Sequence, residues 1–285
     1  MNTFRIVSKL EIKNKNLVKG INYEGLRALG PVSLYAKEYY EDGIDEIIYQ
    51  DIVASLYGKN NILNLVNETA KYIFVPMCVG GGVRSLKDIE NLLKAGADKV
   101  TLNTALIKNP KLLNKAVREF GSSTINVSIE VTRDHNNQII IMYENGRTKA
   151  NLNIFDWIEK IQDDGAGEMT INFVNKDGYL NGTDIEFLYL FKNKINIPFL
   201  VSGGISSEDQ ILYIAKKFKY VSGIVLSSLL HYSKLNQINH KINKFVKSSS
   251  EGNYNYLIQN HEQTKIINVK HIKNFLKQNS IRCRI

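Results

Sequence analysis

VPMCVGGGVRSLKDIENLLKAGADKVTLNTAL, residues 75–106, returns in the same layout as IPFLVSGGISSEDQILYIAKKFKYVSGIVLSSLL, residues 197–230. Each copy reads as an apolar strand, a glycine-rich turn, a helix that follows a serine, a second strand and a small polar pair. FRIVSKLEIK, residues 4–13, likewise returns as TINVSIEVTR, residues 124–133. The offset is about 120 residues each time, so the second half of the chain echoes the first.

Short β-rich runs alternate with stretches of helical periodicity along the chain. The clearest helix covers residues 85–97, with Leu86, Ile89 and Leu92 on one face behind a Ser85/Asp88 capping box. The expected strands are FRIVSKLEI, DEIIYQD, FVPMCVG, KVTLN, INVSIEV, EMTINF, IPFLVSG and GIVLSS. Eight strands separated by helices predict parallel βα units, either in a closed barrel or in a doubly wound open sheet. The internal repeat favours an α/β (β/α)8 TIM barrel built from two similar half-barrels.

We expect residues 1–285 to form one barrel domain, since barrels of this class commonly reach ~250 residues around a single core. The half-barrels are expected at about 1–122 and 123–231. An insertion rich in Asn, Lys and Tyr follows at about 232–267, and a final helix at about 268–279. The insertion is expected to be a lid, a partner-docking element or a partly disordered loop.

The composition is that of a globular protein, with 44% hydrophobic and 23% charged residues. A net charge of +9 indicates an anionic partner, such as a phosphorylated small molecule or nucleic acid, or a solvated basic face near the C-terminal end. Cys78 and Cys283 lack metal-ligand spacing, and no apolar run approaches the ~18 residues of a membrane span. We therefore expect a reduced, cytoplasmic protein with no membrane segment, no metal and no other cofactor.

Glu11 and Glu130 occupy matching places near the carboxyl ends of the first and fifth expected strands. These strands lie opposite each other in an eight-stranded barrel, so the two glutamates are expected to face each other across the catalytic mouth. Two such carboxylates can serve as general acid and general base when their surroundings separate their pKa values. The alternative is that each is a salt-bridged structural residue.

Glycine clusters after two strands predict two anion cradles, because bare backbone N–H groups can approach a phosphate closely there. The next strand in each half ends in small polar residues that supply further donors. The first cradle comprises Gly81, Gly82, Asn103 and Thr104, and the second Gly203, Gly204, Ser227 and Ser228. The implied ligand is elongated, with a phosphate at each end and its reactive middle between the two glutamates. Neither cluster is a Walker loop or a full dinucleotide fingerprint.

The opposite end of the barrel is expected to carry four charges. Arg5 precedes Glu11 by six residues and Lys99 precedes Asn103 by four, and even spacing returns a strand side chain to the same face. Glu46 and Glu168 open the second and sixth strands. The four would form a neutral ring at the bottom of the barrel, either a structural plug or a gate for a small molecule.

With these residues assembled, the chain resembles the cyclase-subunit family of imidazole glycerol phosphate synthase in histidine biosynthesis. The likeness covers nearly all of residues 1 to 231 and resumes at about 268. The motifs that carry it are RIV-x-x-L, LVKGINYEGLR, GIDEIIYQDIVAS, VGGGVRSLKDIENLLKAGADKVTLNTA, FGSSTINVSIE, GAGEM, KDG-x-x-x-GTD and SGGI.

The resemblance implies a partner and a reaction. A glutaminase subunit docks on the N-terminal face of the barrel, and its ammonia passes the gate and reacts with a bis-phosphorylated ribonucleotide at the other face. By matching position, Asp98 is an acidic docking residue, Lys19 lies on a substrate-covering loop after the first strand, and Asp51 ends the second strand at the site. Asp177 and Gly178 join the second phosphate site.

The chain also departs from the family pattern. The family has aspartate at both catalytic positions, where Glu11 and Glu130 stand here, and an acidic residue where Asn175 stands. The first hypothesis is the cyclase, a carbon–nitrogen lyase. The second is a barrel that supplies ammonia to a sugar amidotransferase in surface-glycan modification. Nucleic-acid binding is a third hypothesis, but no aromatic-rich basic motif supports it.

Overall fold

The computed structural model describes residues 3–52, 62–246 and 267–284 of the chain. Eight parallel strands form its centre, and each pairs with a neighbour on both sides. They are β1 (Arg5–Lys13), β4 (Glu46–Asp51), β5 (Met77–Gly80), β6 (Lys99–Leu102), β7 (Ile125–Arg133), β10 (Glu168–Phe173), β11 (Phe199–Ser202) and β12 (Val221–Leu226). The last strand returns to the first, with Arg5 opposite Gly223. The (β/α)8 barrel is therefore confirmed, and the open sheet is excluded.

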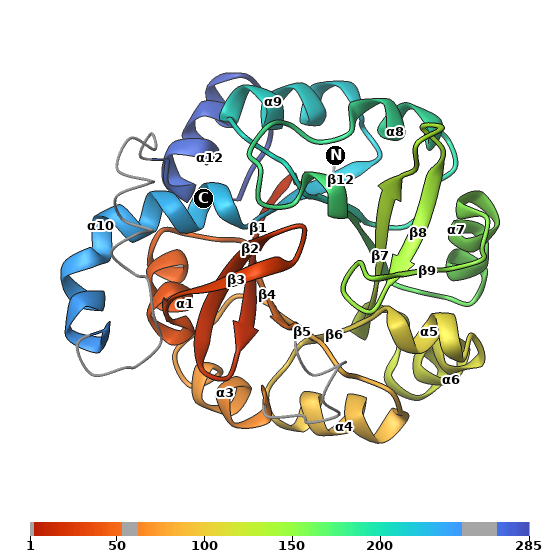
Figure 1. Cartoon of the computed structure of the whole chain (residues 1–285), viewed down its shortest axis with the longest axis horizontal. Helices are drawn as coiled ribbons and strands as arrows, with labels where there is room; N and C mark the ends of the chain where they lie inside the picture. Colours follow the sequence, from red (N-terminus) through yellow and green to blue (C-terminus); the bar gives the residue numbers. More distant parts are fainter. Residues whose placement is uncertain (1–2, 53–61, 247–266, 285) are drawn as a thin grey trace.

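Helices ring the strands, as Figure 1 shows. They are α1 (Val32–Glu41), α3 (Ile62–Thr69), α4 (Leu86–Lys94), α5 (Thr104–Lys108), α6 (Lys111–Phe120), α7 (Ile154–Asp163), α8 (Ile185–Leu190), α9 (Glu208–Lys217), α10 (Ser228–Val246) and α12 (Val269–Gln278). The predicted capping box begins α4: the Asp88 N–H donates to the Ser85 hydroxyl, and the Ser85 N–H donates to the Asp88 carboxylate. Ile89 and Leu92 of this helix are buried against the barrel.

Each half of the barrel adds antiparallel strands to its first strand. β1 continues into β2 (Asn16–Ile21) and β3 (Glu24–Pro31), and β7 continues into β8 (Ile139–Tyr143) and β9 (Thr148–Lys149). The expected loop after the first strand is therefore a hairpin. Asn22 and Tyr23 form its turn with φ of 52° and 62°, the left-handed conformation that a tight two-residue turn requires.

The interior of the barrel changes in character from bottom to top. Four charges lie at the bottom, where β1, β4, β6 and β10 begin. Above them, one wall is apolar, formed by Val7, Ile48, Cys78, Leu200 and Val225. The other wall is polar: Thr101 Oγ1 accepts from Asn126 Nδ2 at 3.0 Å, and the Thr170 hydroxyl donates to Asn126 Oδ1 at 3.1 Å. These hydrogen bonds form a polar strip that crosses β6, β7 and β10 on the inside of the barrel.

Helix α10 packs against β3 on the outside of the first half, whereas α12 lies against α9 of the second half. α10 extends to Val246, so the segment expected as an insertion begins as a continuation of this helix. Lys234 ties it to α1 through the Asp42 carboxylate at 2.7 Å. Residues 247–266 lie outside the described residues, so the role of the insertion stays a prediction.

Candidate functional site

Glu11 lies in a buried cluster of four charges at the carboxyl end of β1. Lys19 Nζ is 2.7 Å from Glu11 Oε2, and Lys9 Nζ is 3.0 Å from Glu11 Oε1. Asp177 pairs with Lys19 and lies 3.7 Å from Lys9. Each of the four is at most 5% exposed. Lys19 was expected on a loop; the pairing of β2 with β1 places it on a strand and turns its ammonium group inward.

The opposite charges of this cluster keep Glu11 and Lys9 ionised. Burial raises the pKa of the Glu11 carboxyl, but the ammonium groups of Lys19 and Lys9 outweigh burial and hold it below its usual value. Burial lowers the pKa of Lys9, and the carboxylates of Glu11 and Asp177 more than reverse this shift. Glu11 is therefore a carboxylate at neutral pH, with each oxygen facing an ammonium group.

Glu130 occupies a different environment in the other half of the barrel. It is 7% exposed, and its Oε2 accepts from the Gly146 N–H at 2.8 Å. Burial raises the pKa of its carboxyl to about 7, against the opposing effects of that hydrogen bond and of Lys9. At neutral pH Glu130 is thus poised between its two protonation states. Lys9 acts electrostatically on both Glu11 and Glu130.

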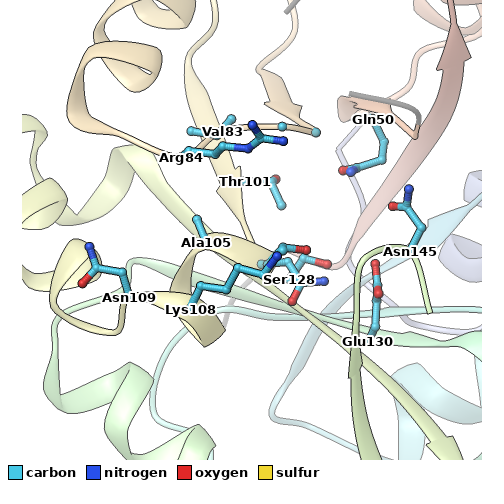
Figure 2. Close-up of a pocket in the computed structure, with 14 residues that line it drawn as sticks. Gln50, Val83, Arg84, Thr101, Ala105, Lys108, Asn109, Ser128, Glu130 and Asn145 are labelled. Atoms are coloured by element: carbon cyan, nitrogen blue, oxygen red, sulfur yellow. The ribbon is translucent and has the colours of Figure 1, made fainter. Parts of the chain in front are cut away.

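The first expected cradle opens into a cavity of about 230 Å³ beside Glu130. Gly81, Gly82, Asn103 and Thr104 all line it, as the sequence predicts. Figure 2 shows Arg84 and Lys108 reaching into this cavity from one side, with Gln50, Asn145 and Glu130 at the other. Backbone amides, an amide side chain and two cationic groups on one wall make this cavity suited to an anionic ligand that reaches Glu130.

The second cradle is a smaller hollow on the other side of the mouth. It is lined by Asp177, Gly178, Gly203, Gly204, Ser227 and Ser228, all six of which the sequence analysis singled out. The buried hydroxyl oxygens of Ser227 and Ser228 have no hydrogen-bond partner among the described residues. Buried hydroxyls are normally paired, so these two indicate a ligand that supplies the missing acceptors. Gly204 leaves no room for a side chain, because a Cβ there would lie 2.4 Å from the Gly182 carbonyl oxygen.

Asp51 supports the first cradle rather than lining it. It is 6% exposed and is not among the residues that line either hollow. Gly81 packs directly on it, with a φ of +102° and a hypothetical Cβ 2.1 Å from the Asp51 carbonyl oxygen. Only glycine fits this place.

Arg5, Glu46, Lys99 and Glu168 close a ring at the bottom of the barrel. Arg5 pairs with Glu46 at 2.9 Å and with Glu168, and Lys99 pairs with both glutamates at 2.9 Å. Burial and the neighbouring Glu168 raise the pKa of Glu46, against the attraction of Lys99 and Arg5. Asp98 lies beside the ring, exposed, and accepts from the Met77 N–H at 2.8 Å.

Some residues of the site were not foreseen. Lys9 could have been found, because its even spacing from Arg5 and Glu11 places it inside the barrel. Tyr23 and Asn145 come from hairpin turns that sequence periodicity did not reveal. These two residues reach the mouth because of how the two hairpins pack on the barrel. A local sequence pattern does not predict that packing.

Within residues 3–52, 62–246 and 267–284, no three His, Cys, Asp or Glu side chains are grouped as metal ligands would be. Among the same residues, no helix combines the length and hydropathy needed to cross a membrane.

Comparison with known proteins agrees with this geometry. The family model described as "Histidine biosynthesis protein" matches residues 5–236. The imidazole glycerol phosphate synthase subunit HisF of Legionella pneumophila is 41% identical over 210 residues, 74% of this chain and 99% of that protein. The subunit HisF of Dictyoglomus thermophilum is 36% identical over 228 residues, 80% and 90% of the two chains. The subunit HisF of Bacillus cereus strain G9842 is 34% identical over 230 residues, which are 81% of this chain and 91% of that protein. The chain belongs to the histidine biosynthesis protein family, alongside HisF-type subunits of imidazole glycerol phosphate synthase.

Proposed function

We propose that this chain is the ammonia-using cyclase subunit of an imidazole glycerol phosphate synthase. It takes a bis-phosphorylated ribonucleotide and ammonia, closes an imidazole ring, and releases imidazole glycerol phosphate and an aminoimidazole carboxamide ribotide. Membership of the family supports the reaction. The observation that carries the proposal is the pair of glycine-lined hollows, one from each half of the barrel, on either side of a buried carboxyl with a pKa of about 7.

The roles of the residues follow from their surroundings. Gly81, Gly82, Asn103 and Thr104 hold one phosphate, and Arg84 and Lys108 add positive charge there. The second phosphate takes the place prepared by Gly178, Gly203, Gly204, Ser227 and Ser228. Glu130 is the general acid, because near neutral pH much of it carries a proton. Glu11, kept ionised by Lys9 and Lys19, stabilises positive charge that develops as ammonia adds and protons move.

Ammonia enters from the opposite face in this proposal. A glutaminase-type subunit docks on the N-terminal face, where Asp98 is exposed, and delivers ammonia to the ring of Arg5, Glu46, Lys99 and Glu168. The polar strip of Thr101, Asn126 and Thr170 then offers hydrogen-bond partners along the interior. A cytoplasmic location, where such metabolites are made, stays a prediction.

The test is direct: purified chain, the ribonucleotide and an ammonium salt, with both products followed by chromatography. Imidazole glycerol phosphate should form without any glutaminase present. If neither product forms while circular dichroism shows a folded protein, the cyclase proposal fails.

One observation favours a second candidate, an ammonia-conducting subunit that serves a sugar amidotransferase. Glu11, at a position where the family has a catalytic aspartate, is 0% exposed and enclosed by Lys9 and Lys19. Under this alternative the chain makes no imidazole product, and its addition increases glutamine-dependent amidination by such a transferase. Product formation in the assay above contradicts it.

A further inference from the structure

A second hollow, of about 20 Å³, adjoins the first cavity on the inside of the barrel, and the polar strip forms part of its wall. A cavity needs roughly 10–15 Å³ of such space to hold one water molecule, so this one holds a single molecule of that size, such as ammonia. Asn126 and Thr170 line it from below, and Glu130 and Tyr23 from above. It is the last chamber before the reacting carboxyl.

Lys9 is the single cationic side chain among the described residues that line this chamber. Its counter-ions, Glu11 and Asp177, are not among those lining residues, and neither is Lys19. The chamber therefore faces one ammonium group and one carboxyl, that of Glu130. Because the Glu130 carboxyl has a pKa of about 7, its charge offsets that of Lys9 only in part near neutral pH.

The position of Lys9 is held from several sides. Its Nζ is 3.3 Å from the Tyr23 hydroxyl and 5.0 Å from the centre of the Tyr23 ring. Its backbone carbonyl lies 3.0 Å from His231 Nε2. With Glu11 at 3.0 Å and a side chain 6% exposed, the ammonium group cannot move into solvent without breaking these contacts.

We propose that Lys9 is a specificity-determining residue, which lets neutral ammonia reach the mouth and excludes ammonium and other small monovalent cations from the chamber. This inference rests on the proposed function. In the partly shielded interior of a protein, two isolated like charges about 4 Å apart repel enough to lower occupancy on the order of a thousandfold. Glu11, 3.0 Å from Lys9, offsets part of this repulsion, so the expected exclusion is smaller than that. Neutral ammonia suffers no such penalty, and it alone carries the free electron pair that the reaction needs.

The first test asks whether removal of the charge admits a cation. Melting temperatures are measured in KCl and in choline chloride at equal ionic strength for wild type, Lys9→Met, Lys9→Arg and Lys37→Met. Lys37, whose side chain is 63% exposed on α1, is the matched control. K⁺ should raise the melting temperature of Lys9→Met alone, because the chamber then faces Glu130 without a resident cation. If Lys9→Met does not fold, Lys9→Met/Asp177→Asn, which removes one charge of each sign, takes its place with the same expectation.

The second test uses ammonium salts as the nitrogen source. For wild type and Lys9→Arg, the KM expressed as neutral ammonia should stay constant from pH 7 to 9, and K⁺ should not compete. For Lys9→Met, K⁺ should raise the KM several-fold without lowering kcat. A merely structural lysine predicts lower stability with no K⁺ effect in either test.

The two claims fail separately. If wild type makes no imidazole product but K⁺ selectively stabilises Lys9→Met, the cation exclusion holds and the proposed reaction is wrong. If K⁺ affects all four proteins equally, or none of them, the assignment of Lys9 is overturned whatever the reaction.

Discussion

At the scale of single residues, Glu11 and Glu130 show how environment divides two identical side chains. Both were expected inside the barrel from their strand positions, and both are buried there. Lys9 and Lys19 flank Glu11 with two ammonium groups, whereas Glu130 accepts a hydrogen bond from the Gly146 backbone N–H. The sequence could predict the burial of each carboxyl but not this difference, because the pairing of Lys19 with Glu11 depends on how β2 folds back on β1.

The pKa of Glu130 predicts a pH dependence of activity. A general acid must carry a proton, and Glu130 loses its proton above pH 7. The value of kcat/KM should therefore fall as pH rises through about 7. Glu130→Gln should lower the rate roughly 10²–10⁴-fold, and the remaining rate should no longer fall as pH rises through 7. A pH–rate profile with ammonia held constant measures both. A rate that instead rises through pH 7 would make Glu130 the base.

The same carboxyl predicts a pH dependence of stability. Since the folded protein binds this proton more tightly than the unfolded chain, its contribution should be greatest below pH ~4.5 and should be lost as pH rises to about 7. Above pH 7, Glu130→Gln should therefore be more stable than wild type, by up to about 3 kcal/mol. Urea unfolding at pH 5 and pH 8 measures this difference. An equal effect of the substitution at both pH values would contradict the raised pKa.

At the scale of elements, each half of the barrel combines an added hairpin with one glycine-lined hollow. The hollows were predictable, because strand, glycine turn and capped helix follow one another in the sequence. The hairpins were not: a turn such as Asn22-Tyr23 lacks the glycine that usually marks it, and the non-glycine φ values appear only once the strands are paired. The local sequence pattern therefore predicts the two glycine-lined hollows, whereas the position of the hairpins at the mouth depends on tertiary packing.

Gly81→Ala tests the first cradle at this scale. The new Cβ would meet the Asp51 carbonyl in a left-handed backbone conformation, so we expect the turn to shift, with a loss of about 2–4 kcal/mol in stability and a higher KM for the ribonucleotide. Gly43→Ala is the control, since Gly43 has a φ of +79° but no atom within 4 Å of its Cβ position. Gly43→Ala should lower the stability by only ~1 kcal/mol and leave the KM for the ribonucleotide unchanged. Chemical unfolding and substrate titration compare the two, and equal effects would remove the special role of this turn.

At the scale of the whole molecule, a charged ring lies at one end of the barrel and the proposed catalytic mouth lies at the other, with one polar wall between them. The eight strands and their repeat allowed this arrangement to be predicted, because the carboxyl ends of parallel strands meet at one face. The described structure adds the chamber between the two ends, which depends on inward side chains of five different strands. No sequence spacing reports such a cavity.

Lys99→Ala tests the passage of ammonia through the ring. Without Lys99, Glu46 and Glu168 keep only Arg5, so the ring should rearrange and leak ammonia. With a glutaminase partner, we expect glutamine-dependent turnover to fall several-fold more than turnover with ammonium salt, because ammonia supplied from solution does not depend on a sealed ring. Lys94→Ala, at an exposed position on α4, is the control and should change neither. Equal losses in both assays would leave the ring with a structural role alone.

The central claim is that this barrel itself incorporates ammonia into an imidazole ring. The most direct measurement supplies ¹⁵N-labelled ammonium and the unlabelled bis-phosphorylated ribonucleotide to the purified chain, and examines the product by NMR. We expect imidazole glycerol phosphate with one labelled ring nitrogen, formed by the wild type and almost absent with Glu130→Gln. Unconverted ribonucleotide with folded wild-type protein, or an imidazole product without label, would contradict it.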